Sequence, residues 1–232
     1  NEFDKELYPK FGSLGVLGQT VKTHGGSGTS NLAYGLVAYE FEKIDSSYRS
    51  SISVQSSLVI HPINEFGSQE QKDKYLPQLI KGEKIGCFGL TESEAGSDPA
   101  SMKTSFKKTK DGYILNGSKN WITNAPIADI FIIWAIEENK DHKSIKGFII
   151  EKNTEGLNTS TIENKTSLKI SPTGQIILNN VFVPNNLCLE NTEGWKSVFS
   201  CLNKARFGIS WGVLGSASEC WLIAKDLSLI HI

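Results

Sequence analysis

The 232-residue chain lacks the patterns that mark several classes of protein. It has no excess of either charge, because 24 basic and 25 acidic residues leave a formal net charge of −1. With acids and bases interspersed, this balance argues against a surface that binds nucleic acid or another polyanion. The sequence also has no uninterrupted apolar run long enough to span a bilayer.

Cysteine is scarce and shows no pairing pattern. Cys87, Cys188, Cys201 and Cys220 have no C-x-x-C spacing and no histidine nearby, which favours reduced thiols over a disulfide framework or a zinc site. No metal is expected. The first residues, NEFDKELYPKFG, do not resemble a targeting segment, so we expect a mitochondrial matrix location in a eukaryote or a cytoplasmic one in a bacterium.

Hydrophobic periodicity divides the chain into three regions. We expect an N-terminal helical domain over residues 1–84, a middle β domain over 85–190 and the start of a C-terminal helical domain over 191–232. Helices, then a mostly antiparallel sheet, then helices define an α+β fold, and the chain is long enough to bury a substantial core.

The N-terminal region carries the spacing and capping residues of helices. Apolar residues recur at helix spacing between Phe3 and Leu14, and a glycine-rich segment, 25–28, then interrupts the pattern. Ser30 or Asn31 is expected to cap a second helix that continues to about Asp45 and is apolar on most sides, which predicts that it is buried.

A third helix is predicted by the capping-box pair Ser68 and Gln71. It is expected to end at Gly82, and Pro77 within it predicts a kink or an earlier end.

From Ile85 the periodicity is that of strands. Asn116-Gly117 lies between two strand-like runs and predicts a β-hairpin turn. Further strands are expected at 130–136, 145–151 and 175–183, before Pro184 ends the sheet and a helical pattern returns at about Glu193.

The most distinctive stretch is 86–102, GCFGLTESEAGSDPASM. A short apolar run leads to Thr91, and an acid-flanked turn follows, in which we expect Gly96 to adopt dihedrals that other residues resist and Pro99 to delay the next helix. A strand that ends in such a turn presents N–H groups and hydroxyls at a sheet edge, where a planar or anionic ligand can bind. The pattern alone predicts either a ligand loop or an ordinary turn after a core strand.

Gly89-Leu90-Thr91-Glu92, two free positions and Ala95-Gly96-Ser97-Asp98 together resemble the signature of the acyl-CoA dehydrogenases at all eight fixed positions. The resemblance implies FAD at the junction of the three domains, with Thr91 facing the flavin ring and Ser97 near the acyl-CoA thioester. Trp121-Ile122-Thr123 is similar to the family's second flavin contact, although Trp121 by itself is also compatible with a core aromatic. The implied cofactor-binding residues are Phe88, Leu90, Thr91, Gly96, Ser97, Trp121, Ile122 and Thr123.

Within the family, the segment from Glu40 to Ser50 and the following SISVQSSLVIHPI resemble glutaryl-CoA dehydrogenase. The resemblance implies that Arg49 pairs with the distal carboxylate of the substrate, assisted by Ser50 and with Glu42 nearby. A buried carboxylate must be paired, and a guanidinium does this with two hydrogen bonds. The alternative is an ion pair of Arg49 with Asp45 on a solvated helix face, which contributes about 0.3–0.5 kcal/mol.

The segment 199–208 resembles the part of the family that contacts CoA, which implies substrate contacts for Phe199, Asn203 and Arg206. Arg206 is equally compatible with a place on the helix surface. His61 has no carboxylate or cysteine partner in the sequence, and we interpret it as a structural residue.

The implied reaction is oxidation of glutaryl-CoA to crotonyl-CoA and CO2, in which a glutamate removes the α-proton and hydride passes to flavin N5. The resemblance also implies a homotetramer, an electron-transfer flavoprotein as acceptor, and a place in lysine and tryptophan degradation or fatty acid metabolism. The catalytic glutamate is expected beyond Ile232, so no catalytic residue is assigned here and this fragment alone is expected to be inactive. An enzyme for another short acyl chain, or a non-catalytic flavin or acyl-CoA binding protein, is the alternative.

Overall fold

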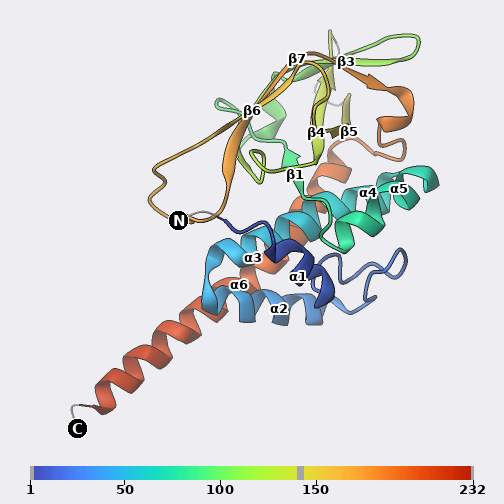
Figure 1. The fold of residues 1–232 in the computed structure, drawn as a ribbon. Coiled ribbons are helices and arrows are strands. Elements are labelled where there is room, and N and C mark those ends of the chain that lie inside the picture. The colour runs from blue at the N-terminus through green and yellow to red at the C-terminus, as the bar shows by residue number, and fades with distance from the viewer. Residues whose placement is uncertain (1–2, 140–143, 231–232) are drawn as a thin grey trace.

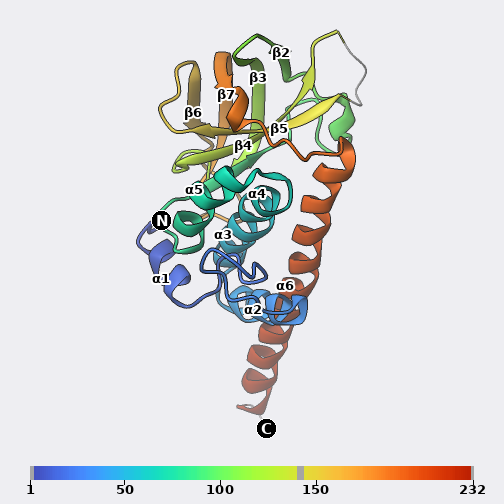
Figure 2. The same cartoon turned by 90° about the vertical axis from the view of Figure 1, so that its right-hand side faces the viewer.

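The structure, a computed structural model, describes residues 3–139 and 144–230. Helices gather at one end of the molecule and a curved sheet at the other, and α6 (Trp195–Leu229) runs from beside the sheet past the other helices (Figures 1 and 2). The α+β fold is therefore confirmed. The expected domain boundaries fall in the connection before the first strand and in the one before α6.

The N-terminal helices are α1 (Leu7–Ser13), α2 (Asn31–Ile44), α3 (Ser46–Ser53), the π-helix η1 (Val54–Ile60), α4 (His61–Phe66) and α5 (Gln69–Ile80). Ser30 caps α2 by accepting the N–H of Ala33. Both hydrogen bonds of the capping box between Ser68 and Gln71 are present at α5. This helix continues past Pro77 to Ile80, so the early end expected there is wrong.

The expectation that α2 is buried on most sides is only partly right. Tyr34 and Glu42 lie on its buried face, whereas Leu32, Leu36 and Ile44 are 56%, 49% and 74% exposed. The buried face packs against α3 and α6, and no described segment covers the opposite face. Apolar composition predicts that a helix needs a partner, but it does not say which faces a partner covers.

A seven-stranded sheet forms the other end of the molecule. Its strands are β1 (Gly86–Gly89), β2 (Ser105–Lys108), β3 (Gly112–Thr123), β4 (Ile130–Glu137), β5 (Ile145–Glu151), β6 (Leu157–Thr161) and β7 (Thr173–Pro184). The order is β1-β4-β2-β3-β7-β6, with β5 also paired to β4. Only the pairs β1–β4 and β2–β4 are parallel, so the sheet is mostly antiparallel, as predicted. Two 3-10 turns, η2 (Pro99–Ser101) and η3 (Asn185–Leu187), follow β1 and β7.

The central strand β4 is buried on both faces. Ile130, Ile132 and Trp134 join the core shared with the helices, while Phe131 and Ile133 join a second core within the curved sheet. Because alternate side chains of a strand point to opposite faces, this one strand connects the two cores.

The hairpin predicted at Asn116-Gly117 is wrong, because both residues lie inside β3. The register with β7 shifts there, and Gly117 has a φ of +141°. A Cβ at Gly117 would lie 2.6 Å from the Cα of Thr104. A bulge and a tight turn both need a permissive backbone, so the same dipeptide serves either structure.

Glycines allow α6 to cross α2 at close range. A Cβ at Gly215 would lie 2.0 Å from the carbonyl oxygen of Tyr39, and one at Gly208 would lie 2.5 Å from the hydroxyl of Tyr34. The 35-residue α6 also packs against η1, α3 and α4. Within the described residues, neither α6 nor another helix has the length and apolarity needed to cross a membrane.

Candidate functional site

Thr91 follows β1 directly and lies beside β3. The amide of Asn120 donates to the carbonyl oxygen of Thr91 at 2.9 Å, and the Asn120 side chain donates to the hydroxyl of Ser93 at 3.2 Å. Thr91 therefore lies directly beside Asn120, the residue before Trp121. The two segments that the sequence analysis assigned to the flavin lie together.

A buried ion pair lies beneath these two segments. Lys119 donates through Nζ to Glu92 Oε1 at 2.8 Å, and the lysine side chain is fully buried. Burial lowers the pKa of Lys119 to about 8, although the charge of Glu92 and its hydrogen bond act in the opposite direction. Burial likewise acts to raise the pKa of Glu92, but Lys119 and the N–H groups of Lys103 and Thr104 hold it below its usual value. Sequence reasoning placed Glu92 in the loop and missed Lys119.

Trp121 stands on a bulge of β3. Between Lys119 and Ile122 the register with β7 shifts, and Trp121 has a φ of +59°. Its side chain is 60% exposed, which rejects the core-aromatic alternative. Bulges re-aim side chains next to binding sites, and a bulky residue held at positive φ is unusual enough to suggest a function.

A cavity of about 450 Å³ opens beside Trp121 and Thr123. Its other wall is the loop between β6 and β7, in which Lys165 donates to the carbonyls of Leu168 and Ser171 and to the hydroxyl of Thr173. The same loop lines a second cavity, of about 340 Å³, against residues 45–47 at the start of α3. The loop thus lies between Trp121 and the helix that carries Arg49 and Ser50.

The remaining cofactor residues divide into core and surface positions. Phe88, Leu90 and Ile122 are buried in the two cores, so they offer a ligand their backbone only. Ser97 is exposed. Gly96 does not have the positive φ that we expected, and that inference is wrong. A Cβ at Gly96 would meet no heavy atom within 4 Å, so the space beside Gly96 is open to a ligand.

Arg49 pairs with Glu42 and not with Asp45. Its Nε donates to Glu42 Oε2, and the two side chains are 11% and 6% exposed. Asp45 instead caps α3 by accepting the N–H of Ser47 at 2.6 Å. Gly212 of α6 covers the pair, since a Cβ there would lie 2.7 Å from Glu42 Oε2. Ser50 is half-buried on the same helix.

The expected CoA contacts lie on the exposed side of α6. Arg206 donates to the side-chain oxygen of Asn203 at 3.0 Å, and both side chains are exposed. Phe199 is partly exposed one turn before Asn203 and lies against Trp195. The geometry leaves both roles of Arg206, ligand contact and surface residue, open.

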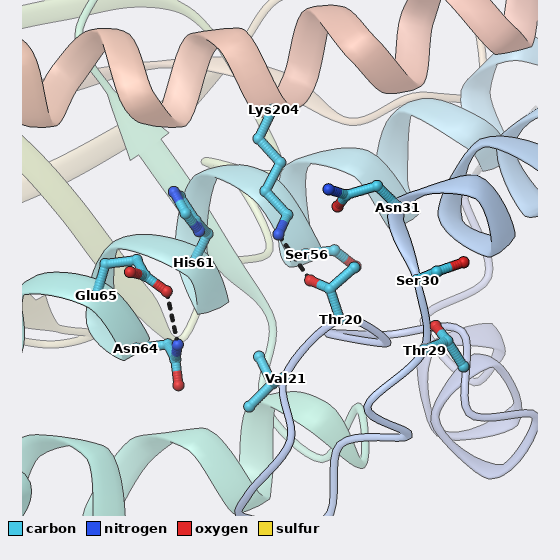
Figure 3. Close-up of a pocket in the computed structure, with 10 residues that line it drawn as sticks. All are labelled: Thr20, Val21, Thr29, Ser30, Asn31, Ser56, His61, Asn64, Glu65 and Lys204. Atoms are coloured by element: carbon cyan, nitrogen blue, oxygen red, sulfur yellow. Dashed lines mark hydrogen bonds between the residues drawn. The ribbon is translucent and has the colours of Figure 1, made fainter.

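A separate polar cavity has a volume of about 440 Å³, and Lys204 of α6 donates there to the hydroxyl of Thr20 at 2.6 Å. Figure 3 shows the residues that line it. His61 lines it and shares a hydrogen bond of 3.1 Å with Ser200. Burial lowers the pKa of His61 to about 4, and the charge of Lys204 acts in the same direction while Glu65 opposes it. His61 is therefore neutral at pH 7, and its structural role stays a prediction.

All four cysteines are free, as predicted. In the part of the chain that the structure describes, no cluster of three or more histidine, cysteine, aspartate or glutamate side chains is placed to hold a metal ion.

Comparison with known proteins identifies the fold. Models of the acyl-CoA dehydrogenase N-terminal domain and middle domain match residues 1–83 and 87–181. The chain belongs to the acyl-CoA dehydrogenase family. The family resemblance seen in the sequence is thereby confirmed.

Individual acyl-CoA dehydrogenases match almost the whole chain. One from Bacillus subtilis is 38% identical over 229 residues, which cover 97% of this chain and 60% of that protein. The crystal structure of a glutaryl-CoA dehydrogenase from Mycobacterium smegmatis in complex with FADH2 is 43% identical, with a TM-score of 0.91, and the match covers 94% of this chain and 55% of that one. Butyryl-CoA dehydrogenase from Megasphaera elsdenii is 35% identical, with a TM-score of 0.90 and a coverage of 97% and 61%. The chain thus spans a little over half the length of its relatives.

FAD, the cofactor expected from the sequence, is the cofactor of this acyl-CoA dehydrogenase family. The site fits such a group. The exposed indole of Trp121 offers a flat surface, the adjoining cavity is bordered by Thr123, and the position of Gly96 leaves room for a ligand to approach the backbone. Planar groups of this kind are held by aromatic faces and by a few well-placed donors.

Proposed function

We propose that the protein containing this chain is a FAD-dependent acyl-CoA dehydrogenase that oxidises and decarboxylates glutaryl-CoA, yielding crotonyl-CoA and CO2. The observation that carries the choice of substrate is the buried guanidinium of Arg49. Among the described residues its hydrogen-bond partner is Glu42, through Nε, which leaves four N–H donors on the two Nη atoms. A distal carboxylate uses such donors, whereas an unsubstituted acyl chain leaves them unpaired at a cost of about 1–3 kcal/mol.

Glu42 prepares Arg49 for this role. The carboxylate fixes one edge of the guanidinium, and Gly212 lies close enough to restrict its movement. A preorganised guanidinium loses little side-chain entropy when it binds a second carboxylate, and its fork geometry matches two oxygens.

The proposed division of labour follows from the positions of the other residues. The hydroxyls of Thr91 and Thr123 and the indole of Trp121 hold the cofactor, and Asn203 and Arg206 contact the CoA. Bound FAD would supply the acceptor for the hydride that leaves the β-carbon. We assign no base to this chain; the buried carboxylates beside the two sites, Glu42 and Glu92, are both engaged in ion pairs. A homotetramer and an electron-transfer flavoprotein as acceptor complete the proposal.

The test is anaerobic reduction of the flavin in the intact gene product. Reduction is monitored as the loss of the absorbance of oxidised flavin at about 450 nm. Glutaryl-CoA and butyryl-CoA are compared in the wild type, in Arg49→Ala and in the control Lys43→Ala, which removes a partly buried charge paired with exposed Glu40. We expect Arg49→Ala to slow reduction by glutaryl-CoA about a hundredfold or more, on the scale of a buried charged contact, and to leave butyryl-CoA within a few-fold.

Other outcomes decide between the alternatives. Equal reduction by both thioesters, unaffected by Arg49→Ala, would leave an acyl-CoA dehydrogenase of short, uncharged chains and remove the role of Arg49. Tight binding of FAD and acyl-CoA with no reduction by either thioester would instead point to a non-catalytic binding protein.

A further inference from the structure

We propose that Lys119 and Glu92 are positioning residues for the cofactor: their buried pair holds the Thr91 segment and the Trp121–Thr123 segment in one arrangement, so that affinity for FAD depends on the pair. The inference rests on the proposed function, which places the flavin between these segments. It differs from a purely structural role, in which the pair would affect folding alone.

The placement of Lys119 ties β3 to the end of β1. Besides Glu92, its Nζ donates to the carbonyl oxygen of Leu90 at 3.1 Å and lies 3.8 Å from the sulfur of Met102. All three acceptors are near Thr91 in sequence or close the loop that follows it. The lysine is two residues before Trp121, so the backbone on either side of the site is fixed through one ammonium group.

Glu92 closes the loop from the other side. Its Oε2 accepts the N–H of Lys103 at 2.7 Å, and its Oε1 accepts that of Thr104 at 3.0 Å. The carboxylate therefore organises residues 92–104, the loop that contains Gly96 and Ser97. Because Glu92 follows Thr91 directly, the bonds of its carboxylate also help to fix the backbone at Thr91.

The strand next to the pair leaves room for it. A Cβ at Gly89 would lie 3.2 Å from Cγ of Lys119 and 2.5 Å from Cδ1 of Ile133. The absence of a side chain at Gly89 thus lets the lysine stem cross β1. Neither Gly89 nor Lys119 belongs to the residues assigned to touch the cofactor, and both act through the backbone that carries those residues.

The test must separate positioning from stability, because a single substitution leaves a buried charge without its partner and is strongly destabilising. The double variant K119M/E92Q removes both charges and keeps similar shapes. The control is K103M, which breaks the exposed pair of Lys103 with Glu94 in the same loop. For each protein the thermal midpoint of the apoprotein, the dissociation constant of FAD and the residual fluorescence of bound flavin are measured.

We expect K119M to lower the midpoint and K119M/E92Q to recover most of that loss. The dissociation constant of FAD should stay about ten- to a hundredfold above wild type in the double variant, which is the scale of effect that a misplaced contact produces. Flavin fluorescence should rise, because the indole of Trp121 no longer lies against the ring. K103M should match wild type in all three measurements.

Recovery of FAD affinity together with the midpoint would overturn the inference, as would a K103M variant that binds FAD as weakly as the double variant. If K119M/E92Q does not fold, the variant K119R tests the inference in its place. This variant keeps the positive charge, so it should fold. Arginine cannot direct three donors from one nitrogen, so the variant should bind FAD more weakly than wild type. Wild-type affinity for FAD would reject the inference. A wild-type protein that binds no FAD would instead reject the proposed function.

Discussion

Glu42 and Arg49 form a buried ion pair that joins α2 to α3, and Gly212 of α6 closes over it. Three helices therefore meet at one guanidinium. The packing of these helices and the proposed choice of substrate therefore depend on the same atoms.

Glu42→Gln should weaken this junction. The amide keeps one acceptor for Arg49 but removes the opposing charge, and we expect a loss of about 1–3 kcal/mol in the free energy of unfolding. Urea titration of the intact gene product measures the loss. Glu40→Gln, at an exposed pair with Lys43 on the same helix, should stay within about 0.5 kcal/mol of wild type. Equal effects of the two substitutions would contradict the importance of the buried pair.

Gly212→Ala should be destabilising by about 1–3 kcal/mol, because the added methyl group must displace Glu42 or move α6 away from α2. Gly96→Ala is the matched control for stability, since a Cβ at that position meets nothing. Chemical denaturation compares the two. If Gly212→Ala unfolds at the same denaturant concentration as Gly96→Ala, the close crossing of α2 and α6 does not exist in solution.

His61 predicts a loss of stability in acid. Its pKa is about 4 in the folded protein and 6.5 in the unfolded chain, so the unfolded chain binds more protons between these values. This contribution to stability is fully present above pH 6.5 and is lost as the pH falls from 6.5 through 4, and the loss reaches about 3 kcal/mol at pH 4. Free energies of unfolding from pH 7 to pH 4 should fall more steeply in wild type than in His61→Asn. Parallel slopes for wild type and His61→Asn would show that burial of His61 does not carry this effect.

Gln71 connects the helices to the sheet domain. Its side chain accepts the N–H of Ser68 and donates to the carbonyls of Asn186 and Cys188, at 2.8 Å each. Gln71→Ala leaves these buried groups unpaired and should cost about 1–3 kcal/mol. Gln69→Ala, two residues earlier and exposed, removes only a bond to Asp73 and should have little effect in the same unfolding assay. A smaller loss for Gln71→Ala than for Gln69→Ala would contradict this account.

Much of the fold could be predicted because its determinants are local. The caps at Ser30 and Ser68, the β-branched runs of β4, β5 and β7, and the helical spacing after Glu193 each lie within a window of a few residues. The short, polar strand β6 and the π-helix η1 have no such pattern, and they were not predicted. Asn116-Gly117 was misassigned because a bulge and a turn draw on the same backbone freedom.

The sequence by itself determined the family, the order of the helical and sheet regions, and the two segments that carry Thr91 and Trp121, since all of these are encoded in contiguous residues. Only the tertiary structure decided that Arg49 pairs with Glu42, that Gly212 covers the pair and that Lys119 lies buried against Glu92, 27 residues away in the chain. The physical reason is that the partner of a buried charge depends on which elements pack together, and packing is a property of the whole chain.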